Sequence, residues 1–239
     1  MAAHRTARAL AREKITADII DEGRRQLAEH GAAGLSLRSV ARELGMVSSA
    51  MYRYVANRDD LLTRLIVEAY DSLGDAVDAS VASSWERAPL DRWVLAAHAV
   101  RDWAVDRPHE YFLVFGTPVP GYAAPDTTTA PGIRAPRALI RIVTEALSAK
   151  QVKRPRGRAT AAMSPELVDD FATLQTNLDA SAGFTAELIL AILTGWTQMF
   201  GLLSFELSNQ TKGTVEHHRD LFDSSARLMA AQIGLADSE

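Results

Sequence analysis

The sequence predicts an all-α protein, and three observations support that fold class. Apolar residues recur at helical spacing in almost every segment of the 239 residues, and no segment alternates as a half-buried strand would. Glycine, proline or helix-capping residues separate these segments. With 47% hydrophobic residues, the chain has a globular composition and room for one large or two modest domains.

Two helices are expected before residue 45. The first ends at Gly31, and the second extends from a Ser36 cap to Gly45, because serine commonly caps a helix and glycine commonly ends one. Each has one apolar stripe, formed by Ile15, Ile19, Ile20 and Leu27 in the first and by Leu37, Val40, Ala41 and Leu44 in the second.

A third, very short helix is expected after Gly45, with Met51 and Val55 facing inward at i, i+4. Asn57 is expected to cap a long fourth helix. Two aspartates follow in its first turn, where the helix dipole favours negative charge.

Further helices are predicted toward the C-terminus, near residues 90–106, 109–115, 133–149, 164–178, 185–208 and 214–234. Residues 116–132 contain four prolines and three glycines, which argues against regular helix there. Residues 150–164 are interpreted as a linker.

Two short helices joined at a glycine are typical of a helix-turn-helix, whose second helix enters the major groove of DNA. The inward Met51 and Val55 would leave Ser48, Ser49, Tyr52 and Arg53 facing outward. Arginine reaches guanine edges or phosphates, and small serines allow close approach. Residues 1–58 hold ten Lys or Arg against six Asp or Glu, which favours a polyanionic partner. The alternative is an ordinary amphipathic helix with a solvated polar face.

The stretches "GLSLRSVARELGM", "MYRYV" and "NRDDLL" within residues 15–66 resemble the N-terminal domain of the tetracycline-repressor (TetR) family of bacterial transcription regulators. The resemblance implies a helix-turn-helix domain over residues 1–62 and a ligand-binding and dimerisation domain over residues 63–239. It further implies DNA contacts by Arg38, Ser48, Ser49, Ala50, Arg53 and Tyr54, and phosphate contacts by Tyr52 and Arg58. Arg5, Arg8 and Arg12 are interpreted either as an arm toward DNA or as a tail.

The last two predicted helices are candidates for a subunit interface. Residues 186–207 are apolar nearly all round, and residues in the final helix repeat at seven, the spacing of a packing seam. By the family resemblance, two such helices per subunit form a four-helix interface that includes Leu203, Leu221, Phe222, Leu228 and Met229. The alternative is that both helices lie wholly inside a monomer core.

The segments 107–125 and 195–207 resemble a C-terminal subclass named for a Trp-His-Gly signature. Trp196 and Gly201 match it, but Phe200 stands where the signature has histidine, which predicts a more apolar pocket. The candidate pocket residues are His98, Trp103, Tyr111, Phe112, Phe115, Trp196, Gln198, Met199 and Phe200. Taken singly, each aromatic residue also fits an ordinary place in the core.

Other functions find little support in the sequence. There is no cysteine, no repeated metal-ligand spacing, no nucleophile elbow and no phosphate-binding loop, so we expect no metal, no cofactor and no enzyme activity. Without a signal peptide or about 18 uninterrupted apolar residues, a cytoplasmic protein without membrane contact is expected. We therefore predict a homodimeric repressor that a small apolar molecule releases from a palindromic operator. The alternative is an all-α protein-interaction or scaffold module.

Overall fold

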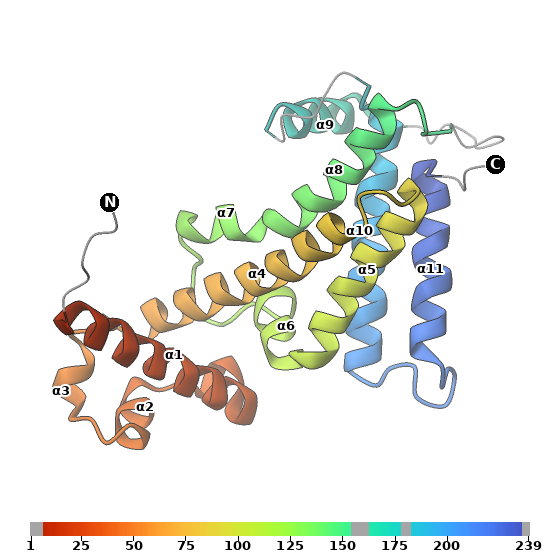
Figure 1. Cartoon of the computed structure of the whole chain (residues 1–239). Coiled ribbons are helices and arrows are strands. Elements are labelled where there is room, and N and C mark those ends of the chain that lie inside the picture. The colour runs from red at the N-terminus through yellow and green to blue at the C-terminus, as the bar shows by residue number, and fades with distance from the viewer. Residues whose placement is uncertain (1–6, 154–162, 178–182, 236–239) are drawn as a thin grey trace. The chain divides into compact units, whose positions relative to one another are not determined.

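The computed structural model describes residues 7–153, 163–177 and 183–235. No strand occurs in these three stretches, so the all-α prediction is confirmed there; Val152 and Leu235 form one isolated bridge. The elements are α1 (Ala7–Gly34), α2 (Leu37–Glu43), α3 (Ser48–Met51), α4 (Arg58–Ser83), α5 (Pro89–Asp106), α6 (Pro108–Phe115), η1 (Asp126–Thr128), α7 (Thr129–Gly132), α8 (Arg134–Ser148), α9 (Pro165–Asn177), α10 (Ala186–Leu207) and α11 (His218–Ile233) (Figure 1).

The chain divides into two compact units. The first unit consists of Met1–Ser72 and Arg107–Gly132, and the second of Leu73–Asp106 and Ile133–Glu239. The predicted division between residues 62 and 63 falls within α4, ten residues from the division that the contacts give. The first unit also contains α6, η1 and α7, which the sequence had placed with the second domain.

The core of the first unit joins α1 to the two short helices after it. Ile19, Val40, Met51, Val55 and Leu61 have exposures of 0–1% and belong to one apolar cluster. Met51 and Val55 therefore face inward, as the sequence predicts. Burial of these side chains removes apolar surface from water, and it fixes which face of α3 remains outside.

Helix boundaries agree with the sequence in some places and differ in others. Asn57 caps α4 as predicted: its Oδ1 accepts the Asp60 backbone N–H at 2.8 Å. Ser36 precedes α2 in an extended conformation but makes no side-chain capping bond. Gly45 has φ 64°, a left-handed conformation that suits glycine in the turn between α2 and α3.

Three other predictions about helix positions need correction. Arg8 and Arg12 lie inside α1, not in an arm before it, whereas Arg5 falls outside the described residues. Within residues 116–132, η1 and α7 form short helical turns that the proline content had argued against. α11 begins at His218, four residues later than expected.

In the second unit, α10 and α11 lie side by side, and α5 packs against both (Figure 1). Leu203, Phe222 and Met229 are 0–2% exposed between these helices. They form part of the unit's own core and offer no surface to a second subunit, which corrects their assignment to an interface. α10 is less enclosed than its apolar sequence indicates: only 22% of its most apolar stretch is buried.

Candidate functional site

The outer face of α3 and of the turn that follows it (residues 52–54) is polar and exposed. Ser48, Ser49, Tyr52 and Arg53 are all exposed, and Ala50 is half-buried. Arg38 is exposed on α2, the preceding helix. The first unit thus presents serine hydroxyls on a short helix, and a tyrosine and an arginine in the turn after it, while Met51 and Val55 are buried on the inner side. Such a face can donate to phosphate oxygens and to base edges.

Arg12 of α1 contacts the turn that follows α3. Its Nη2 donates to the Arg53 backbone carbonyl at 3.0 Å, and its guanidinium lies 5.7 Å from the centroid of the Tyr54 ring. Tyr54 is half-buried and packs against the core of the first unit. These contacts hold the backbone from which the Arg53 side chain projects. Sequence reasoning missed this contact, because the residues that it joins are 41 positions apart.

Arg58 holds the turn between α1 and α2. Its Nη2 donates to the Ala32 carbonyl at 2.8 Å and its Nε donates to the Leu35 carbonyl at 3.2 Å. The side chain is 34% exposed. Two of its five N–H donors therefore bond to the protein's own backbone, and its Nη1 lies 3.7 Å from the Asp59 carboxylate.

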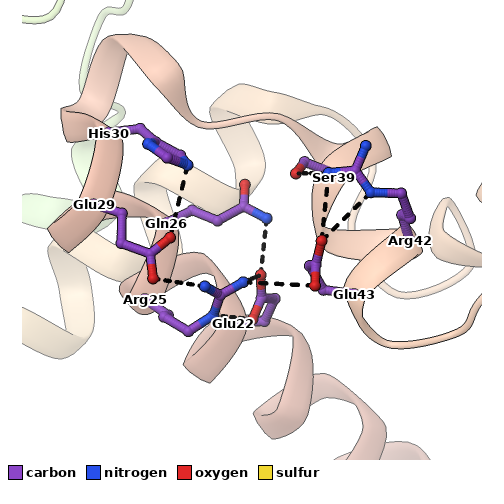
Figure 2. A network of polar contacts seen from close by, with 8 residues as sticks. All are labelled: Glu22, Arg25, Gln26, Glu29, His30, Ser39, Arg42 and Glu43. Atoms are coloured by element: carbon purple, nitrogen blue, oxygen red, sulfur yellow. Dashed lines mark hydrogen bonds and ion pairs between the residues drawn. The ribbon is translucent and has the colours of Figure 1, made fainter.

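A polar network joins α1 to α2 (Figure 2). The Glu22 carboxylate accepts from Arg25 at 2.7 Å and from Gln26 at 2.9 Å, and Arg25 also reaches Glu29 and Glu43. The bond from Arg25 lowers the pKa of the Glu22 carboxyl, outweighing the opposing effect of burial. The contact of this network that reaches α2 is the ion pair of Arg25 with Glu43, at 3.9 Å.

The second unit contains an apolar cavity of about 220 Å³. Helices α5, α8, α9 and α10 contribute its walls, and eleven of its twelve lining residues are apolar or aromatic. The lining residues are Trp93, Ile133, Pro136, Leu139, Ile140, Leu174, Gln175, Phe184, Ile189, Ile192, Leu193 and Trp196.

Of the nine residues predicted to form a pocket, Trp196 alone lines this cavity. Phe200 packs on Trp196, with ring centroids 4.5 Å apart, whereas Met199 and Trp103 are buried in the core. Gln198 lines a different groove, described below. The prediction chose residues by their aromatic type. The faces on which most of these residues lie in their helices do not border the cavity.

The remaining predicted pocket residues have other partners. Tyr111, Phe112 and Phe115 of α6 belong to the first unit, where Tyr111 packs against both phenylalanines and Phe115 contacts Tyr70.

His98 of the second unit shares a 2.9 Å hydrogen bond with Asp223 of α11. That bond lowers the pKa of the Asp223 carboxyl. His98 is thus a link between α5 and α11 and does not line the cavity.

A partly apolar surface remains on α10 and α11. Leu228 is 61% exposed and Phe205 is 58% exposed, and Leu221 is half-buried. Gly201, in the middle of α10, is exposed, and a Cβ added there would meet nothing within 4 Å. A groove of about 330 Å³ lies beside these residues and includes Gln198 and His218 in its lining.

Two further features bear on the excluded functions. No group of three or more His, Asp or Glu residues suited to a metal ion occurs within the described residues. Among those same residues, α10 is the one helix long and apolar enough to cross a membrane by length and composition, a test that core helices of soluble proteins also pass.

The first unit has the features of a helix-turn-helix DNA-binding domain. They are the turn at Gly45, the short helix α3 packed on the core through Met51, and the polar outer face. Residues 19–65 match the family model of bacterial regulatory proteins of the tetR family, and residues 93–229 match the tetracyclin repressor-like C-terminal domain. The chain belongs to the TetR family of transcription regulators.

Named relatives support the same family. The chain is 39% identical over 230 residues to the HTH-type transcriptional regulator Rv1816 of Mycobacterium tuberculosis and to Mb1846 of Mycobacterium bovis, with 92% of this chain and 93% of each relative covered. These relatives are regulators and not enzymes, in agreement with the sequence prediction.

Solved structures agree. The regulatory protein SCO4313 matches with a TM-score of 0.74 and 31% identity, covering 95% of this chain and all of that one. A tetR-family regulatory protein from Rhodococcus RHA1 matches with a TM-score of 0.62 at 17% identity, covering 94% of this chain and 99% of that one, which supports the fold alone.

Proposed function

We propose that this regulator is a homodimeric repressor that binds a palindromic operator and is released by a small apolar molecule in the cytoplasm. The observation that carries the DNA-binding half is the exposed polar face of α3 above the buried Met51 and Val55. The apolar cavity of the second unit supports the ligand-responsive half.

Within the DNA-binding surface, Arg53 is assigned to base edges, and Arg38 and Tyr52 to the phosphate backbone. Ser48, Ser49 and Ala50 allow α3 to approach the groove closely, because none of them fills it. Tyr54 and Arg58 are reassigned from DNA contacts to the support of α3 and of the α1–α2 turn, on the basis of their internal contacts.

The homodimer is assigned to the exposed side of α10 and α11, with Leu221 and Leu228 retained from the predicted interface. Three observations favour a partner there: the low burial of an apolar helix, the exposure of Leu228 and the glycine at position 201. Glycine inside a helix costs roughly 0.5–1 kcal/mol relative to alanine. A side chain at position 201 would meet no atom of the same subunit within 4 Å, so packing inside the subunit does not require glycine there. Close approach by a helix of a second subunit would require it.

A symmetric dimer would place one copy of α3 in each half-site of a palindromic operator. Half-sites in successive major grooves lie roughly 34–36 Å apart. A ligand weakens operator binding only as far as it binds more tightly to the protein conformation that does not bind DNA. This coupling free energy is typically about 1–3 kcal/mol. By reciprocity, operator DNA weakens ligand binding by the same factor.

The test is to sequence DNA fragments retained by the purified full-length protein from a random pool. The proposal predicts an inverted repeat, with affinity that falls steeply as salt rises because phosphate contacts release counterions. Retention of fragments without a shared motif, or affinity independent of salt, would contradict it. The latter result would favour a protein-interaction module.

A further inference from the structure

We propose that Val47 contacts the C5-methyl group of a thymine in the major groove, and so adds a base preference to the operator. The proposal rests on the proposed reading of DNA by α3 and adds a specificity-determining residue to it. Three observations support it: the exposure of the Val47 side chain, its place at the start of α3, and the absence of a packing or capping role for it among the described residues.

Val47 lies at the end of α3 that approaches the base edges. It is the N-cap residue of α3 and is 70% exposed, the highest value among the large hydrophobic residues that the structure describes. Ser48 and Ser49 follow it and are also exposed. In helix-turn-helix proteins, the N-terminal residues of the second helix contact base edges. An apolar side chain at this position is therefore placed to meet a base.

Packing inside the first unit does not account for a valine here. The apolar cluster of this unit includes Met51, and Met46 and Tyr54 pack against it as partly buried neighbours, but Val47 is not part of it. Its apolar surface stays in contact with water, so the hydrophobic effect gains nothing from it in the free protein. Single exposed apolar residues are common on protein surfaces, so exposure alone does not identify a contact.

Helix capping does not account for it either. Val47 has φ −68° and ψ 135°, the extended conformation usual for an N-cap residue, and its side chain makes no capping hydrogen bond. Serine, threonine, asparagine and aspartate are strongly preferred at this position, because their oxygens accept from N–H groups of the first turn, and valine is among the least favoured residues. The chain thus has a residue that is unfavourable for folding at the end of α3 that approaches DNA. Such a conflict with local rules is typical of functional positions.

The chemistry of the major groove identifies the partner of this side chain. Thymine presents an apolar group there, its C5-methyl, whereas the other groups on the base edges are hydrogen-bond donors and acceptors. Apolar side chains recognise this methyl group by direct contact. The branched valine side chain has few χ1 rotamers, so it loses little freedom when it is held against a base. Ser48, Ser49 and Arg53 offer hydrogen bonds, and Val47 adds the apolar contact that they lack.

Replacement of thymine by uracil removes this methyl group and leaves the hydrogen-bonding groups of the base unchanged. The test uses the full-length protein and the operator obtained by selection, with each thymine replaced in turn by uracil, and fluorescence anisotropy measures the affinity. We expect one position in each half-site at which uracil weakens binding about fourfold, which corresponds to the loss of one buried methyl group. A half-site without an A·T pair, or uracil tolerated at every position, would overturn the proposal.

Val47→Ala shortens the side chain and should remove the preference, so that thymine and uracil operators bind with equal affinity. Val47→Ile keeps a branched apolar side chain and should retain it. Val105→Ala is the matched control, because Val105 is also exposed, at 41%, but lies on α5 of the second unit; it should discriminate as the wild type does. A uracil effect that persists undiminished in Val47→Ala would assign the methyl contact to another residue and refute the role of Val47.

Val47→Ser separates a DNA contact from a structural role. Serine is a better N-cap residue, so this variant should raise the urea midpoint while it loses the preference for thymine over uracil. A midpoint lower than that of the wild type would show that Val47 stabilises the first unit, and would contradict the proposal.

The uracil series also tells the two proposals apart. Loss of sequence preference at all operator positions would contradict the reading of DNA by α3. Sequence preference at other positions, without any response to uracil, would contradict the role of Val47 alone.

Discussion

Replacement of Arg58 by methionine tests whether this residue supports the protein or contacts DNA. Its two hydrogen bonds, 2.8 Å to the Ala32 carbonyl and 3.2 Å to the Leu35 carbonyl, would be lost. A hydrogen bond from a charged donor contributes about 1.5–3 kcal/mol. Because the side chain is 34% exposed, water replaces part of this, and we expect a net loss of roughly 2 kcal/mol in the free energy of unfolding.

Urea denaturation followed by circular dichroism measures this loss. With a urea dependence of roughly 1–3 kcal/mol per molar, the midpoint for Arg58→Met should fall by roughly 1 M. Arg42→Met is the matched control, because the Arg42 side chain is 76% exposed and its ion pair with Glu43 lies at the surface. Such pairs contribute about 0–1 kcal/mol, so the control midpoint should move little.

The salt dependence of DNA binding gives the opposing test for Arg58. Each neutralised phosphate adds about 0.9 to the slope of log affinity against log salt. If Arg58 of both subunits contacted phosphates, Arg58→Met would reduce this slope by roughly 1.8. We predict an unchanged slope under conditions where the variant is folded. An unchanged urea midpoint together with a shallower slope would refute the structural role.

Three further predictions concern other contacts. Leu228→Glu should place an unpaired charge in the proposed interface and give a monomer by light scattering; a wild-type protein that is already monomeric at micromolar concentration would rule out the dimer. Asn57→Ala should lower the free energy of unfolding by about 1 kcal/mol through loss of the α4 cap, and an unaltered unfolding curve would show that the cap contributes nothing. The lowered pKa of Glu22 contributes stability above its ordinary pKa of about 4.3, and this contribution is lost as pH falls through the lowered value. Glu22→Gln should therefore flatten the fall in stability as the pH drops below about 4.3, and a profile as steep as that of the wild type would refute the assignment.

The helix-turn-helix could be predicted from the sequence because its signals are local. The positions of Met51 and Val55, the turn at Gly45 and the cap at Asn57 all depend on spacing within a few residues. The outward face of α3 follows directly once the inward side chains are known.

The cavity and the interface could not be predicted in the same way. A repeat of seven relates Phe222 to Met229, but it does not tell whether that stripe faces α5 and α10 or a second subunit. Trp93 and Phe184 were missed as cavity residues because their proximity depends on tertiary packing.

The central claim, that α3 reads DNA sequence, is tested most directly with Arg53→Ala on a library of single-base variants of the selected operator. A lost contact to a base edge should cost about 1–3 kcal/mol on the intact operator and relax the preference at one position in each half-site. A preference profile identical to that of the wild type, with binding weakened equally on all variants, would show that Arg53 contacts only the backbone and would contradict the claim.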